Sequence, residues 1–359
     1  MRASRFQQKH GATLGLKKAD VKSLPIYCRL EVYAREYLIR RKKTSSPFKS
    51  ERFFNVKHLK LIEIQQKSLP SPSESRFSFG ITLMLLSSKL HSYANAIKSV
   101  ESTRRTIVPQ ASTLGLTLET AAQTLAALHI LNTADGLDSV GRKVIAESTT
   151  RRSSDNPQAC LGHHYASRTV QSKNDEVIFS THNSTRLFLE PKLVLKFSHT
   201  PDISTSLEQF TQLFESVALG IEILKAPFKG DAWSFEDKVC SNGLGHQLII
   251  GEAKTLSEKR KRNFSDVLNH ATFGLNRVSK ESSQLLNYAL GRDAAVSSIS
   301  DLYEVFKRQC QIDECSPFRQ NDLISLNALC TPVKLTAGQE YVFVASGIDL
   351  AALRIRFVQ

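Results

Sequence analysis

The 359-residue chain lacks the short motifs that mark common chemistries. It has no GxxxxGK[ST] phosphate loop, no GxSxG nucleophile elbow and no HExxH zinc motif. Gly243-Leu-Gly245 begins a GxGxxG pattern but is not followed by the third glycine. His163 and His164 are a tempting ligand pair, yet neighbouring side chains on a strand point to opposite faces and cannot share an ion. We therefore expect this pair to lie in a loop.

The cysteines give neither a metal site nor a disulfide framework. There are six: Cys28, Cys160, Cys240, Cys310, Cys315 and Cys330. None forms a CxxC pair, and only Cys310 and Cys315 lie close together in the sequence. This spacing fits neither a zinc ribbon nor a disulfide-rich scaffold, so we expect mostly buried free thiols.

Several segments resemble a known family when they are read in order. They are Thr106–Ala121, Val140–Val144, Leu189–Leu193, Leu219–Ile223, Asp237–Asn242 and Asn321–Val358. Their order and spacing resemble the 2-keto-4-pentenoate hydratase and 4-oxalocrotonate decarboxylase group of the fumarylacetoacetate hydrolase superfamily. The resemblance covers roughly residues 95–359 and implies an α+β fold, a mixed β-sheet roll with flanking helices.

The resemblance also implies a site for Mg²⁺ or Mn²⁺. In the family, an E-x-E pair on a strand and a third glutamate hold the ion, which stabilises the enolate formed from a 2-oxo acid. Strand side chains at i and i+2 share a face, so two carboxylates there can converge on one hard cation. By this match Glu190 is the first ligand and Glu222 the third. Lys143 and Asn242 match catalytic positions near the substrate.

This chain departs from the pattern at the second ligand, which is Lys192. At about 4 Å, two like unit charges repel by roughly 4 kcal/mol at an effective dielectric of 20, and a divalent ion roughly doubles that figure. Lys225 replaces a usual acidic residue, and Leu326–Thr331 replaces a small, hydroxyl-rich segment. We therefore expect metal affinity to fall by several orders of magnitude, leaving no metal cofactor with Lys192 in place.

Two placements of Lys192 remain open. Its ammonium can fill the vacated metal space between Glu190 and Glu222, where burial lowers the lysine pKa and the carboxylates raise it. Such a pocket could still bind a small carboxylate through Lys192. Alternatively, Lys192 extends outward to solvent, and the two glutamates are unremarkable polar residues.

Two functions follow from these alternatives. One is a metal-dependent lyase, a hydratase acting on 2-oxo-4-enoic acids, which the retained Glu190, Glu222 and Lys143 favour. The other is a catalytically silent relative that binds a small 2-oxo acid, or that serves as a homo-oligomer or as a subunit of a larger assembly. Lys192 and Lys225 favour the second function, and we prefer it on mechanism.

The elements that position these residues follow from caps and apolar periodicity. Thr117 can cap a helix that runs to about Leu131. Ser204 or Thr205 can cap a second helix, with apolar residues at 207, 210, 214 and 217. Ser300 can cap a third helix. Strands are expected at Leu187–Phe197, His246–Ile250, Leu323–Leu326, Glu340–Ala345 and Leu353–Val358. Helices and strands do not alternate regularly, which favours an α+β body.

The net charge of +14 belongs mainly to the first 75 residues, with 17 Lys and Arg against 6 Asp and Glu. We expect residues 1–75 to form a basic extension and to be the part suited to nucleic acid. The absence of acids before Asp20 suggests organellar, mitochondrial targeting, and a cytoplasmic location is the other interpretation. Residues 76–96 are either the first core element or a signal-like segment cleaved near Ala96, and residues 97–359 form the hydratase-like domain. No apolar run is long enough for a transmembrane span.

Overall fold

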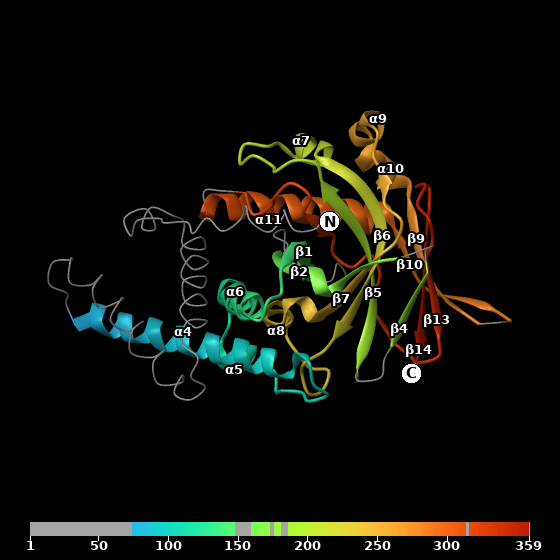
Figure 1. The fold of residues 1–359 in the computed structure, drawn as a ribbon. Coiled ribbons are helices and arrows are strands. Elements are labelled where there is room, and N and C mark those ends of the chain that lie inside the picture. The colour runs from blue at the N-terminus through green and yellow to red at the C-terminus, as the bar shows by residue number, and fades with distance from the viewer. Residues whose placement is uncertain are drawn as a thin grey trace, which may run out of the picture. The chain divides into compact units, whose positions relative to one another are not determined.

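Two β-sheets form the centre of the fold (Figure 1). The structure is a computed structural model that describes residues 74–147, 159–172, 176–180, 186–279, 281–313 and 316–358. The larger sheet contains β1 (Ser139–Ala146), β2 (Ala159–Tyr165), β3 (Thr169–Gln171), β5 (Leu187–Phe197), β6 (Phe214–Lys225), β7 (Gly245–Ile250), β8 (Lys254–Thr255), β11 (Leu323–Ser325) and β12 (Val333–Lys334). The smaller sheet contains β4 (Glu176–Ser180), β9 (Thr272–Val278), β10 (Ser283–Leu290), β13 (Glu340–Ser346) and β14 (Leu353–Val358).

Both sheets are mixed. The main path of the larger sheet runs β2-β1-β11-β5-β6-β7-β3, with β1 parallel to β11 and β3 parallel to β7, and the other pairs antiparallel. The smaller sheet runs β10-β9-β13-β14-β4, with only the β14–β4 pair parallel among these strands. These mixed sheets and their helices confirm the predicted α+β class.

The long antiparallel pair β5 and β6 divides two cores. Side chains at odd positions, such as Leu193 and Leu195 on β5 and Leu219 and Ile221 on β6, belong to the main core with the smaller sheet. Because side chains alternate along a strand, the even positions face the opposite way, toward β1 and the helices. Those positions carry Glu190, Lys192 and Glu222, so strand alternation places all three on one face.

Helices cover this second face and the flank of the larger sheet (Figure 1). The α-helices in the described part of the chain are α4 (Glu74–Glu101), α5 (Ala111–Leu114), α6 (Leu118–Ala134), α7 (Leu207–Gln212), α8 (Phe235–Cys240), α9 (Glu258–Arg262), α10 (Phe264–His270) and α11 (Ser297–Asp313). The helix α6 packs against both α4 and α8, while α11 packs against β1 and β2. A smaller core, with Leu125 and Leu128 of α6 at its centre, joins α4, α8 and the end of β6.

The helix α6 follows the sequence prediction, but two other helices do not. Thr117 caps α6 by accepting a hydrogen bond from Thr120 N. The second helix ends early, since α7 is capped by Ser206 and positions 214 and 217 lie in β6. The apolar residues from Phe214 onward are buried on both faces of a long strand, so their helical spacing was misleading. Ser300 lies inside α11 instead of capping it, and its hydroxyl donates to the Val296 carbonyl.

The helix α4 spans the apolar segment 76–96 and continues without a break through Ala96. Its described side chains include the buried Tyr93 and Ile97, which pack in the core with α6. The Tyr93 hydroxyl donates to Asp237 Oδ1 of α8 at 2.5 Å. Cleavage near Ala96 would therefore remove Tyr93 from this core. Export after such a cleavage stays a prediction, and so do the predicted domain limits.

The basic extension lies almost wholly outside the described residues, and so do its expected roles in targeting and nucleic-acid binding. Within the described part of the chain, no helix has the length and hydropathy needed to cross a membrane. Four of the six cysteines are described, and Cys160, Cys240, Cys310 and Cys330 are buried free thiols, as predicted.

Candidate functional site

The two central strands bring Glu190, Lys192 and Glu222 together. Glu190 and Glu222 are direct cross-strand partners in the β5–β6 register, and Lys192 stands opposite Gly220. Side chains of direct partners lie on the same face about 5 Å apart at Cβ, and i, i+2 neighbours share that face. The register therefore makes one cluster from residues that are up to 32 positions apart in sequence.

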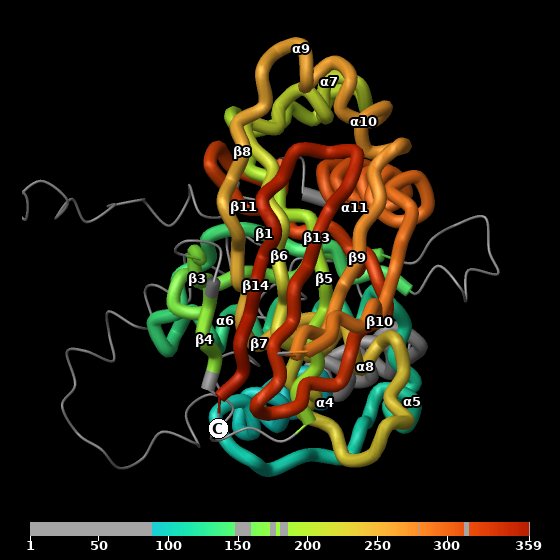
Figure 2. Tube along the Cα trace, turned by 90° about the vertical axis from the view of Figure 1, so that its right-hand side faces the viewer, coloured from blue at the N-terminus to red at the C-terminus, as the bar shows by residue number. Residues whose placement is uncertain are grey.

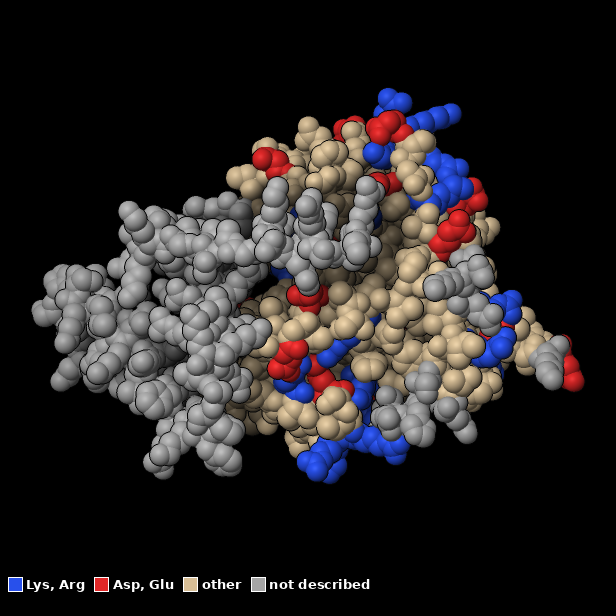
Figure 3. Space-filling view, viewed as in Figure 1, with Lys and Arg blue, Asp and Glu red and all other residues tan. Residues whose placement is uncertain are grey.

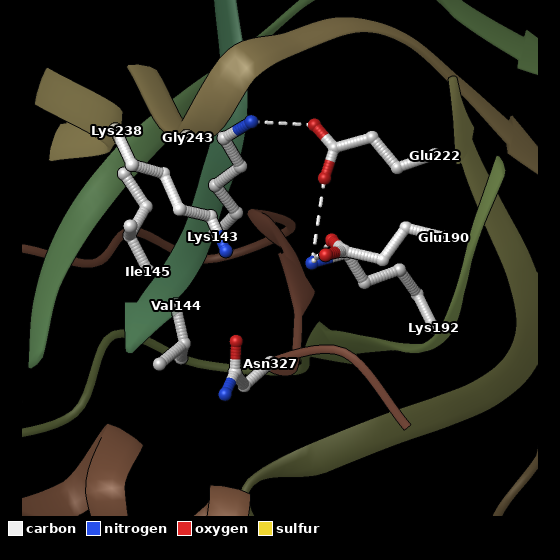
Figure 4. A pocket seen from close by; sticks show the side chains of 9 residues that line it. All are labelled: Lys143, Val144, Ile145, Glu190, Lys192, Glu222, Lys238, Gly243 and Asn327. Atoms are coloured by element: carbon white, nitrogen blue, oxygen red, sulfur yellow. Dashed lines mark hydrogen bonds and ion pairs between the residues drawn. The ribbon is translucent and has the colours of Figure 1, made fainter. Parts of the chain in front are cut away.

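Lys192 lies between the two carboxylates (Figure 4). Its Nζ is 2.6 Å from Glu190 Oε2 and 3.4 Å from Glu222 Oε2. The other oxygen of Glu222, Oε1, accepts a 2.5 Å hydrogen bond from Lys143 Nζ of β1. All four side chains are at most 3% exposed. The result is a buried chain of alternating charges, Lys143, Glu222, Lys192 and Glu190, with a formal sum of zero.

Burial and the neighbouring charges shift the pKa values in this chain in opposite directions. Burial lowers the pKa of Lys192, but attraction to Glu190 and Glu222 outweighs it, and the lysine pKa is raised. Burial alone would raise the pKa of Glu222, whereas Lys143 and Lys192 bring it down to about 2. For Lys143, burial dominates over the attraction of Glu222, and its pKa is lowered. Lys192 is thus charged at neutral pH and neutralises the carboxylates beside it.

Two glycines leave the space that the buried pairs occupy. A Cβ at Gly245 would stand 2.0 Å from Lys143 Nζ and 2.3 Å from Glu222 Oε1. A Cβ at Gly162 would stand 2.6 Å from Asn242 Oδ1 and 3.0 Å from Lys143 Cε. Sequence reasoning missed both positions, because a glycine that clears space for a distant ion pair leaves no local pattern. Gly245 was noticed only as part of an incomplete GxGxxG motif.

No protein-family model matches this sequence, and no curated protein matches it. Among solved structures, it is similar to 4-oxalocrotonate decarboxylase from Pseudomonas putida G7 complexed with magnesium and adipate. The TM-score is 0.63 at 12% identity, over 76% of this chain and 98% of that chain. This chain has the fold of that decarboxylase, the fumarylacetoacetate hydrolase fold. The same decarboxylase complexed with calcium and acetate matches equally well. A yeast protein of the fumarylacetoacetate hydrolase family gives a TM-score of 0.42 at 12% identity, over 61% and 93% of the two chains.

Decarboxylase structures with this fold hold magnesium or calcium, but the donors present here do not fit a divalent ion. Glu190 Oε1 and Glu222 Oε2 accept no hydrogen bond from the described residues, and carboxylate oxygens are the ligands that a hard divalent ion takes. However, the Lys192 ammonium lies within 3.4 Å of both carboxylates. The described part of the chain also contains no group of three or more His, Cys, Asp and Glu that could hold a metal.

The fumarylacetoacetate hydrolase fold places the remaining predicted residues around this cluster, but not in contact with it in every case. Asn242, in a left-handed conformation (φ 55°), accepts from His163 N at 2.8 Å and donates to His163 O at 3.0 Å. Its amide therefore fastens the 242–245 turn to β2 next to Lys143, and a catalytic role stays a prediction. Lys225 points elsewhere, with Nζ donating to the Glu101 carbonyl of α4 at 2.7 Å.

The segment Leu326–Thr331 closes the pocket from the side of β5. Leu326 N and Leu329 N donate to the carbonyls of Leu193 and Pro191, which ties the segment to the strand. Asn327 lines the pocket together with Lys143, Glu190, Lys192 and Glu222. The volume left for a water-sized molecule is about 0 Å³. Side chains therefore fill the space between the charged groups.

The histidine pair lies in β2, so the prediction of a loop is wrong. The two side chains need not share an ion, since each has its own partner on its own face. The His163 ring stacks on His129 of α6 with centroids 3.6 Å apart, and His164 Nε2 is 2.7 Å from Ser325 Oγ. Burial holds the pKa of His164 at about 3 and that of His129 at about 4, so both are neutral at physiological pH. The sequence held no signal for the partners His129 and Ser325.

Proposed function

We propose that this chain is a metal-independent relative of the metal-binding enzymes that share its fold, with the Lys192 ammonium in place of the divalent ion. It would then not catalyse hydration or decarboxylation of 2-oxo acids, and would act as a binding or assembly protein. The observation that carries the proposal is the position of Lys192 Nζ, 2.6 Å from Glu190 and 3.4 Å from Glu222.

Charge balance supports the replacement. Two lysines and two glutamates already sum to zero in a site that is almost fully buried. Adding a divalent ion would leave a buried excess of two positive charges, and the repulsion from an ammonium at about 4 Å is roughly 8 kcal/mol at an effective dielectric of 20. That repulsion corresponds to about six orders of magnitude in affinity. An ion could enter only if Lys192 moved away.

The packing of the pocket supports the loss of catalysis. A 2-oxo acid needs space beside the catalytic groups, and this pocket leaves none for a water-sized molecule. A ligand carboxylate would have to compete with Glu190 and Glu222 for Lys192, and would also have to displace packed side chains. Binding of a small 2-oxo acid at Lys192 is therefore disfavoured on both counts.

A metal-dependent hydratase or decarboxylase is the second candidate, and one specific observation favours it. Glu190 and Glu222 are opposed across β5 and β6, and Lys143 contacts Glu222, so three of the residues matched to the family's site adjoin one another. If Lys192 swung out of the cluster, the two carboxylates would be in place to bind an ion.

Two measurements separate the candidates. The full chain is assayed on 2-hydroxypenta-2,4-dienoate with Mg²⁺ or Mn²⁺, and we expect no turnover above that of a Glu222→Ala variant. Calorimetric titration with Mg²⁺ should give no binding to the wild type and measurable binding to Lys192→Glu. Lys196→Glu, on the same strand but paired with Glu215 near the surface, is the matched control and should not gain binding. Turnover by the wild type above the control, or equal Mg²⁺ binding by the wild type and Lys192→Glu, would refute the proposal.

A further inference from the structure

We infer that a second cavity binds a small monocarboxylate with an apolar body, independently of the Lys192 cluster. The cavity has a volume of about 200 Å³ and is bounded by β6, β8, α9, α10 and the turn between β13 and β14. Figure 2 shows this turn beside β8 and α10 at one end of the smaller sheet. Val217 in its lining is five residues from Glu222 along β6, or about 17 Å, and on the opposite face of the strand.

The interior of this cavity is apolar. Val217, Leu256 and Phe264 form its floor and are each at most 5% exposed. Val267 of α10 and Ile348 of the β13–β14 turn form half-buried walls. Apolar cavities of about 150 Å³ are large enough to bind benzene, so this one can hold a phenyl ring or a branched aliphatic group.

The mouth of the cavity is charged and carries an excess of one positive charge. Lys254 of β8 and Arg260 of α9 line it together with a single carboxylate, Asp349. Lys254 forms an ion pair with Asp349, and Arg260 Nη2 is 3.7 Å from the same carboxylate. The Asp349 side chain is 73% exposed, so it can turn to solvent at little cost and release both cations.

Charge and shape together define the ligand. A carboxylate held against Arg260 would accept two parallel hydrogen bonds from the guanidinium, while its apolar body entered the cavity. One negative charge balances the excess at the mouth. The helix α9 adds the basic run Lys259–Arg262, and Figure 3 shows Lys and Arg, with Asp and Glu among them, at this end of the molecule. That field draws anions toward the mouth. The class is therefore a small aromatic or branched aliphatic monocarboxylate.

Benzoate is the probe, and benzyl alcohol is its neutral counterpart of similar size. Binding to the full chain is measured by calorimetry or by ligand-detected NMR. We expect benzoate to bind at least about tenfold more tightly than benzyl alcohol, the scale of one charge-assisted contact. Arg260→Gln should lower benzoate affinity by about the same factor, whereas Arg262→Gln, on the same helix but outside the lining, should not.

Two further variants test the competition and the cavity. Asp349→Asn should raise benzoate affinity several-fold, because it removes the carboxylate that competes for Lys254 and Arg260. Val267→Phe should abolish binding by filling the cavity, and its thermal unfolding shows whether it remains folded. If Val267→Phe does not fold, the substitutions at the exposed mouth, Arg260→Gln and Asp349→Asn, still test the inference. The inference is overturned if the wild type binds no benzoate, if benzyl alcohol binds equally well, or if Arg262→Gln weakens binding as much as Arg260→Gln.

Discussion

Replacing Lys192 by methionine tests the buried charge chain directly, because it keeps an unbranched side chain only one atom shorter and removes its charge. At an effective dielectric of 20, the contacts of 2.6 and 3.4 Å to Glu190 and Glu222 are worth about 6 and about 5 kcal/mol of attraction. Much of this is offset by the desolvation of the ammonium, and breaking a buried pair typically costs 3–5 kcal/mol, or about 4 kcal/mol here. We expect a loss of this size in the free energy of unfolding.

The assay is urea denaturation of the full chain at pH 7, with Lys196→Met as the matched control. Lys196 lies four residues further along β5 and pairs with Glu215 at 2.9 Å, but both side chains are about one-third or more exposed. Its loss should cost less than about 1 kcal/mol, as surface pairs do. The penalty for Lys192→Met should shrink as the pH falls toward 4, since a protonated carboxyl is cheaper to bury than a charged one. Equal penalties for the two variants would refute the account of Lys192.

Further predictions concern neighbouring parts of the structure. Gly245→Ala should destabilise the chain by about 2–4 kcal/mol in urea denaturation, because its Cβ would separate Lys143 from Glu222. The wild type should lose stability as the pH falls from about 4.5 toward 2, since the contribution of Glu222 is fully present above its unfolded pKa and is lost progressively as the pH falls to its folded pKa of about 2; a denaturation series across this range measures it. Tyr93→Phe should cost about 1–2 kcal/mol and lower the melting temperature, since Asp237 then loses a buried donor. A Tyr93→Phe variant as stable as the wild type would show that this bond does not anchor α4.

The sequence was most informative where one local pattern decides the structure. The limits of β5 were predicted correctly because the strand is one short, mostly apolar run, and Thr117 identified the start of α6 because capping is local. The prediction failed from Phe214 onward, where apolar residues fill both faces of β6 and helical and strand periodicities cannot be told apart.

The site was predictable in composition but not in its contacts. The resemblance singled out Lys143, Glu190, Lys192 and Glu222, and the structure brings these four together. The pairing of Lys143 with Glu222 joins residues 79 positions apart, and strand register decides it, which no local spacing encodes. The roles of these residues in catalysis or metal binding stay predictions until the assays are made.

A cation that belongs to the polypeptide differs from a dissolved one in how it reaches its place. Lys192 is delivered when β5 and β6 pair, at a fixed ratio of one per chain and with no dependence on the supply of ions. If Lys192 takes the place of the ion, as we propose, the centre would have no empty form, could not be loaded with a wrong element, and would be indifferent to chelators. Such a centre would be permanent, and it could not exchange its cation.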